Sequence, residues 1–83
     1  MNDHQDRENF SYTTSWSDIE SMLREAEREQ NKHFVALNHN GLSKAKKIFH
    51  MRKYKGLQGV IVSLRWVLGD LHISKDKVLG KSD

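Results

Sequence analysis

Apolar residues recur at helical spacing between residues 19 and 37. Six of them share one stripe about 120° wide, namely Ile19, Met22, Leu23, Ala26, Phe34 and Leu37. The run Ser17-Asp18-Ile19-Glu20 matches a capping box, so a helix is predicted from about Ser17 to about Asn38. Gly41 is the predicted stop, because glycine adopts left-handed backbone at little cost. A competing interpretation makes residues 33–37 a short strand.

Two further amphipathic segments follow. Ser43 is predicted to cap a second helix from about Lys44 to Tyr54, with Gly56 as its end and an apolar side made of Leu42, Ala45, Ile48 and Phe49. A third helix is predicted from Leu57 to His72. Its apolar face is the strongest periodic signal in the chain, and consists of Leu57, Val60, Ile61, Leu64, Val67, Leu68 and Leu71.

Three helices joined by short turns, in a chain without proline, predict an all-α fold. We expect a small three-helix bundle over residues 15–73. Residues 1–14 are polar and lack periodicity, which predicts a flexible arm. Residues 74–83 are expected to form a polar tail, in which Val78 and Leu79 are candidates for a last short turn.

The length and composition exclude several classes of protein. With 83 residues and no cysteine, the chain is limited to one domain without a disulfide, a thiolate metal site or a cysteine nucleophile. Five histidines are scattered; His33 and Glu29, four residues apart, supply two metal ligands but no third. No catalytic triad or phosphate-binding loop is present, so we expect no enzyme activity, cofactor, metal or small-molecule substrate.

The polarity of the chain predicts a soluble, cytoplasmic protein. The longest hydrophobic stretch, from Leu57 to Leu71, contains Gln58, Arg65 and Asp70 and is too short to span a membrane. The segment from Met1 to Phe10 is polar and charged, unlike a signal peptide.

Charge is distributed unevenly. Residues 1–29 carry eight acids and three arginines, a net charge of minus five, whereas residues 30–69 carry eight lysines and arginines and no acid. Such a polarity lets the two halves attract each other, within one molecule or between copies, or lets the basic half meet an acidic partner.

The densest basic run makes nucleic-acid binding an alternative function. Its cations neutralise phosphates whatever the base sequence, and they are Lys44, Lys46, Lys47, Arg52, Lys53 and Lys55. Phe49 and Tyr54 are interleaved as possible stacking groups. The cations do not share one face of the predicted helix, however, so the competing interpretation is a solvated helix that balances the acidic first helix. An acidic protein or lipid surface is a further alternative.

The run Gly56-Leu57-Gln58-Gly59 resembles in spacing the GxxG loop with which KH domains approach nucleic acid. The strands of a KH sheet are missing from the predicted elements. A DNA-reading helix-turn-helix is also disfavoured, because the exposed side of the third helix offers Gln58, Ser63 and Arg65 rather than a row of base-reading donors.

Val62 and Trp66 lie one turn apart on the back of the predicted third helix. A helix with apolar groups on both faces is either central or has a partner. We therefore favour a small non-enzymatic regulatory or adaptor protein, of the kind found among phage accessory proteins, that binds a protein partner or self-associates. The expected contacts are Val62, Trp66, Arg65 and Tyr54, with the basic run steering the partner. In the competing interpretation, Phe10, Tyr12 or the tail covers Trp66.

Overall fold

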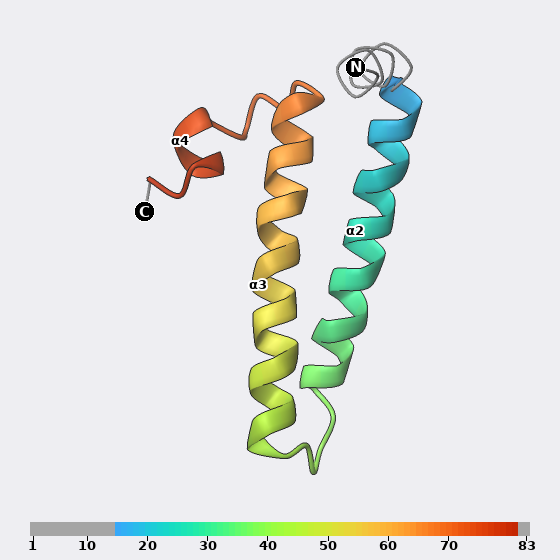
Figure 1. Ribbon diagram of the computed structural model, residues 1–83, viewed down its shortest axis with the longest axis vertical. Helices are drawn as coiled ribbons and strands as arrows, with labels where there is room; N and C mark the ends of the chain where they lie inside the picture. Colours follow the sequence, from blue (N-terminus) through green and yellow to red (C-terminus); the bar gives the residue numbers. More distant parts are fainter. Residues whose placement is uncertain (1–14, 82–83) are drawn as a thin grey trace, which may run out of the picture.

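A computed structural model of the chain describes residues 15–81. Within these residues all regular structure is helical, with no strand, which confirms the all-α prediction. Figure 1 shows two long antiparallel helices, α2 and α3, with the short helix α4 beside α3 on the side away from α2. The predicted arm, residues 1–14, lies outside the described residues.

Helix α2 spans Trp16–Leu37, so the strand interpretation of residues 33–37 is wrong. Its capping box begins at Ser15, two residues before the predicted one. The Ser15 hydroxyl accepts a hydrogen bond from the Asp18 amide at 3.2 Å, and the Asp18 carboxylate accepts one from the Ser15 amide at 3.2 Å. Asn38 caps the C-terminus, and Gly41 takes the positive φ of 82° expected of a turn glycine.

Helix α3 spans Lys44–Val67 and is capped by the predicted Ser43, whose hydroxyl accepts from the Lys46 amide at 3.3 Å. The predicted second and third helices are therefore one helix, and the break at Gly56 is wrong. A helical glycine costs about 1 kcal/mol relative to alanine, which packing of the residues on both sides against α2 outweighs. The GxxG run is accordingly helical and forms no loop.

The C-terminus of α3 comes earlier than predicted. Gly69, with φ of 90°, ends the helix after the C-cap Leu68. Leu71, predicted on the apolar face, lies beyond this stop and is 98% exposed. Ser74 then caps α4, which spans Lys75–Val78 within the predicted polar tail. Three helices are thus present in residues 15–81, as expected, with different bounds.

The α2–α3 contact has the spacing of an antiparallel coiled coil. Along each helix, the residues facing the other helix recur at alternating intervals of four and three. We call these residues the inner seam: Ile19, Leu23, Ala26, Gln30, His33 and Leu37 of α2, and His50, Tyr54, Leu57, Ile61, Leu64 and Leu68 of α3. All are buried or half-buried, which places the core between these two helices.

This core is thin. The buried side chains in residues 15–81 are Ala26, Ile61 and Val62. Met22 and Phe34, predicted on the apolar stripe of the first helix, are about half exposed because they flank the inner seam. The radius of gyration of 16.4 Å exceeds the value of about 12 Å for a compact domain of this length. The fold therefore buries little of its apolar surface by itself.

Candidate functional site

Polar members of the inner seam fix how α2 and α3 align. The Gln30 amide donates to the Gln58 side-chain oxygen at 2.7 Å and to the Tyr54 carbonyl at 3.3 Å. One turn nearer the loop, His33 Nδ1 and His50 Nδ1 lie 2.8 Å apart, a hydrogen bond in which one ring donates and the other accepts. Polar pairs at seam positions specify register in coiled coils.

A second seam runs along α3 beside the first. Each of its residues comes one position before an inner-seam residue of α3. One residue corresponds to a rotation of about 100° around the helix axis, so the second seam faces a direction about 100° away from the inner seam. We call it the outer seam: Phe49, Lys53, Gly56, Val60, Ser63 and Val67. Five of its residues are exposed to solvent and Ser63 is half-buried. Phe49 is 51% exposed, Val60 37% and Val67 43%.

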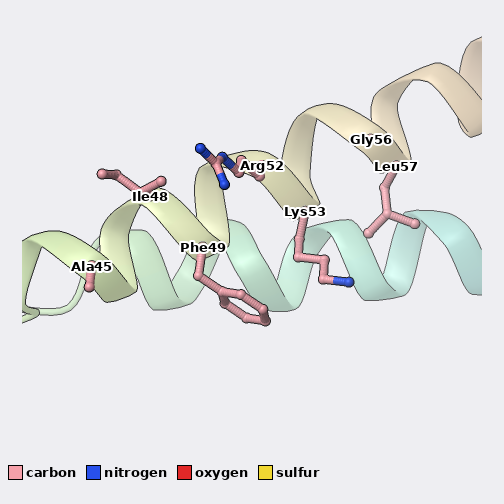
Figure 2. A pocket seen from close by; sticks show the side chains of 7 residues that line it. All are labelled: Ala45, Ile48, Phe49, Arg52, Lys53, Gly56 and Leu57. Atoms are coloured by element: carbon pink, nitrogen blue, oxygen red, sulfur yellow. The ribbon is translucent and has the colours of Figure 1, made fainter.

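The first half of the outer seam borders an open groove of about 640 Å³ (Figure 2). Phe49, Lys53 and Leu57 line one side, and the Lys53 ammonium lies 5.7 Å from the centre of the Phe49 ring. Gly56 leaves a gap in the row of side chains along the helix. The other lining residues are Ala45, Ile48 and Arg52. Ala45, Ile48 and Phe49, which the sequence placed on the core side of the second helix, therefore face solvent.

No packing within residues 15–81 requires glycine at positions 56 and 59. A Cβ built on either would meet nothing within 4 Å, and both residues are helical. Glycine disfavours a helix, and no contact within the hairpin explains why α3 has glycine at these two positions. At Gly56 the missing side chain leaves the backbone of α3 accessible from the groove.

The antiparallel hairpin separates charge along its length. The acids of α2 lie beside the second half of α3, where Glu27 pairs with Arg65. The basic run of α3 lies near the loop, beside the end of α2. Within residues 15–81, none of the cations from Lys44 to Lys55 forms an ion pair with an acid. Because Arg24 and Arg65 offset part of the charge of these acids, one end of the hairpin is weakly acidic, whereas the other is strongly basic.

Two acids, one exposed and one half-buried, have local partners. The hydrogen bond and charge of Lys32, at 2.8 Å, hold the pKa of Glu29 below its usual range. The backbone amide of His72, 2.9 Å from Asp70 Oδ1, lowers the pKa of Asp70, helped by the His72 side chain and Arg65. Asp70 thereby holds the turn between α3 and α4.

The structure does not bring the four predicted partner-binding residues onto one open surface. Val62 is only 7% exposed and lines a cleft with Ile73 and Lys77, so the expectation that it lies open on the back of the helix is wrong. Tyr54 belongs to the inner seam, where its ring centre lies 6.2 Å from that of Phe34. Trp66 remains 45% exposed.

The segments that follow α3 explain the change at Val62. Sequence reasoning treated them as a tail, whereas α4 contacts α3 and the turn before it is held by Asp70. The back of α3 at Val62 is thereby covered. The exposed apolar residues of α3 include Phe49, Val60 and Val67, which lie along the outer seam.

In residues 15–81, no three histidine or acidic side chains gather closely enough to hold a metal ion. Among the same residues, no helix has the length and apolar character needed to cross a membrane. The chain matches no protein-family model, no curated protein and no solved structure. The surface of the hairpin is therefore the feature of this protein that bears on its function.

Proposed function

We propose that this protein is a non-enzymatic adaptor that binds another protein chain through the outer seam of α3. In this proposal the hairpin supplies two helices of a bundle, and the partner covers the face of α3 that α2 and α4 leave open. The expectation of a three-helix bundle within one chain is thus replaced by a bundle completed on binding.

One observation carries the proposal: the apolar surface left uncovered greatly exceeds the core. Ala26, Ile61 and Val62 are buried, while the large apolar side chains more than a third exposed are Trp16, Met22, Phe34, Val35, Ile48, Phe49, Met51, Val60, Trp66, Val67, Leu71 and Leu79. Three of them, Phe49, Val60 and Val67, belong to the outer seam of α3. Helices with two apolar faces occur where a second helix packs on the outer face.

The basic run contributes to recognition rather than to the apolar contact. Its cations surround the first half of α3 and flank Ile48 and Phe49, so they raise the rate at which an acidic surface meets the groove. Lys53 is placed to act at shorter range, because its ammonium already lies against the Phe49 ring.

Site-specific photo-cross-linking tests the proposal. Phe49 is replaced by p-benzoylphenylalanine in the full chain, which is then irradiated in cell extract and, separately, as the purified protein. We expect covalent adducts with a protein, which includes a second copy of the chain. The matched control places the same photo-reactive residue at Asn31, an exposed position of α2 away from both seams. Equal labelling from both positions, or none from Phe49, would overturn the proposal.

The unpaired cations favour nucleic acid as a second candidate ligand. Phosphate binding requires cations that are not neutralised internally, and the run from Lys44 to Lys55 meets this condition within the described residues. The distribution of these cations disfavours nucleic-acid binding, because they lie all around the helix and do not form one continuous basic face.

Fluorescence anisotropy with a labelled mixed-sequence oligonucleotide tests this second candidate. Binding that weakens steeply as salt rises, and that is lost in Lys46→Glu with Lys53→Glu, would support it. Absence of binding at low salt would exclude it.

A further inference from the structure

We infer that the partner of the outer seam is a second copy of this chain, packed antiparallel so that the two outer seams face each other. This inference rests on the proposed function and identifies the occupant of the same face. The resulting dimer is a four-helix bundle with α3 helices in contact across a two-fold axis.

The spacing of the outer seam has the symmetry that such a dimer requires. Its six positions are arranged symmetrically about Gln58, near the middle of α3. An antiparallel pair related by a two-fold axis at Gln58 therefore places every outer-seam residue opposite another one. Phe49 lies opposite Val67 of the second copy, and Lys53 lies opposite Ser63.

The third pair of opposed residues gives a role to Gly56, for which the hairpin alone provides none. In this register Gly56 lies opposite Val60 of the second copy, so that a side chain fills the gap left by a missing one. A Cβ on Gly56 would meet nothing within its own hairpin, and the space beside it belongs to the open groove. Large and small residues that alternate across a contact let two helices interdigitate.

Charge complementarity selects a second copy and the antiparallel direction. The hairpin is acidic at one end and basic at the other, so an antiparallel copy sets each basic end beside an acidic one. Asp18 and Glu25 each precede an inner-seam residue by one position, which turns them toward the same side as the outer seam. In the register centred on Gln58, Lys53 reaches about the level of Glu25 of the second copy, and Lys46 that of Asp18. A parallel copy would instead oppose the two basic ends.

The angle between the seams sets the shape of the dimer. In a square bundle each helix meets two neighbours at roughly a right angle, and the inner and outer seams of α3 are about 100° apart. Helix α3 thus occupies a corner with α2 on one side and the second α3 on the other. Helix α4 contacts α3 near Val62, away from the outer seam, and does not block the contact.

Disulfide cross-linking tests the register, and the absence of native cysteine makes the result unambiguous. Lys53 and Ser63 face each other only between copies, because within one α3 they are separated by about 15 Å. The full-length chain is prepared as Lys53→Cys, Ser63→Cys and the double variant. Each is oxidised at high micromolar concentration after its helicity has been compared with that of the unsubstituted chain.

We expect the double variant to form covalent dimers in the majority of chains and each single variant to form at most a few per cent. Cross-linking of the single variants to the same extent would indicate a parallel or unspecific contact and would overturn the inference, as would a double variant that stays monomeric. If Phe49 meanwhile photo-cross-links to a different protein, the proposed function stands and only the identity of the partner is wrong. If Phe49 labels nothing, both fail.

Discussion

Individual glycines in this hairpin have opposite physical roles, although they look alike in the sequence. Gly69 takes a left-handed conformation that other residues adopt at a cost, whereas Gly59 is helical and lies about 80° around α3 from the outer seam. Substitution of each by alanine should therefore change the free energy of unfolding in opposite directions.

We predict that Gly59→Ala raises the free energy of unfolding by about 0.5–1 kcal/mol, because alanine is the better helix former and its Cβ meets open space. Gly69→Ala should lower it by about 1 kcal/mol, because its φ of 90° disfavours a side chain. Urea unfolding monitored by circular dichroism measures both. A loss of stability in Gly59→Ala would show that another chain occupies the space beside this position.

The two histidines of the inner seam form the other residue-scale feature. Each ring satisfies a nitrogen of the other, so removal of one leaves a half-buried nitrogen without its partner. We predict that His33→Leu and His50→Leu each lower the free energy of unfolding by about 1 kcal/mol. The double variant should lose less than the two single variants together, because leucines pack across the seam without a polar requirement.

A double-mutant cycle from urea unfolding measures this coupling. Strict additivity would show that the two rings do not interact.

At the scale of elements, the turn between α3 and α4 depends on one carboxylate. Asp70 accepts from the His72 amide, and its pKa in the fold is depressed below the ordinary value of 3.8. The stabilisation it gives is therefore present above pH 3.8 and is lost as the pH falls through the lower folded-state pKa.

We predict that the amide proton resonance of His72 moves on acidification with a midpoint below pH 3.8, as the charged acceptor is neutralised. The Asp70→Asn variant should show no such transition. Nuclear magnetic resonance titration of the labelled chain provides the measurement. A midpoint at or above the ordinary value would contradict the hydrogen bond as the cause of the shift.

Local signals predicted the helices but not where they join. Ser43 as a cap, Gly41 as a turn residue and the all-α class followed from the sequence because each depends on a few adjacent residues. The continuity of α3 did not, because the cost of Gly56 is local while the packing of Tyr54, Leu57 and Ile61 against α2 depends on residues distant in the chain.

In the candidate site, too, features that depend on adjacent residues were predicted and features that depend on distant residues were not. The basic run and the exposure of Trp66 were predicted from the sequence, but the outer seam was not. The break at Gly56 assigned Ile48 and Phe49 to a core, Val60 and Val67 were placed on the apolar face of the third helix, and Val62 was left outside. Counting intervals of four and three through the glycine, from His50 to Leu68, would have revealed one helix with two seams. The burial of Val62 depends on the turn at Asp70, which periodicity does not report.

At the scale of the whole molecule, the proposed dimer implies that the separation of charge governs how two copies approach. We predict that Glu25→Lys weakens the dimer by about three- to tenfold, because it sets like charges near Lys53 of the second copy twice per dimer. Adding Lys53→Glu should restore most of the affinity. Sedimentation velocity over a dilution series at low salt measures both, and the effects should shrink at high salt.

As a control, Glu20→Lys makes the same change of charge on an exposed residue of α2 that does not face the outer seam. An equal loss of affinity in this control would show that net charge, and not the arrangement across the two-fold axis, governs association.

The central claim is that the outer seam of α3 joins two copies of the chain at Gly56, and sedimentation equilibrium tests it most directly. The unsubstituted chain should show a reversible monomer–dimer equilibrium, and Gly56→Leu should weaken it by at least about tenfold because the side chain occupies the space of Val60 of the second copy. Asn31→Leu, which adds the same side chain away from both seams, should leave the equilibrium unchanged. A chain that is monomeric at every concentration, or a dimer indifferent to Gly56→Leu, would contradict the claim.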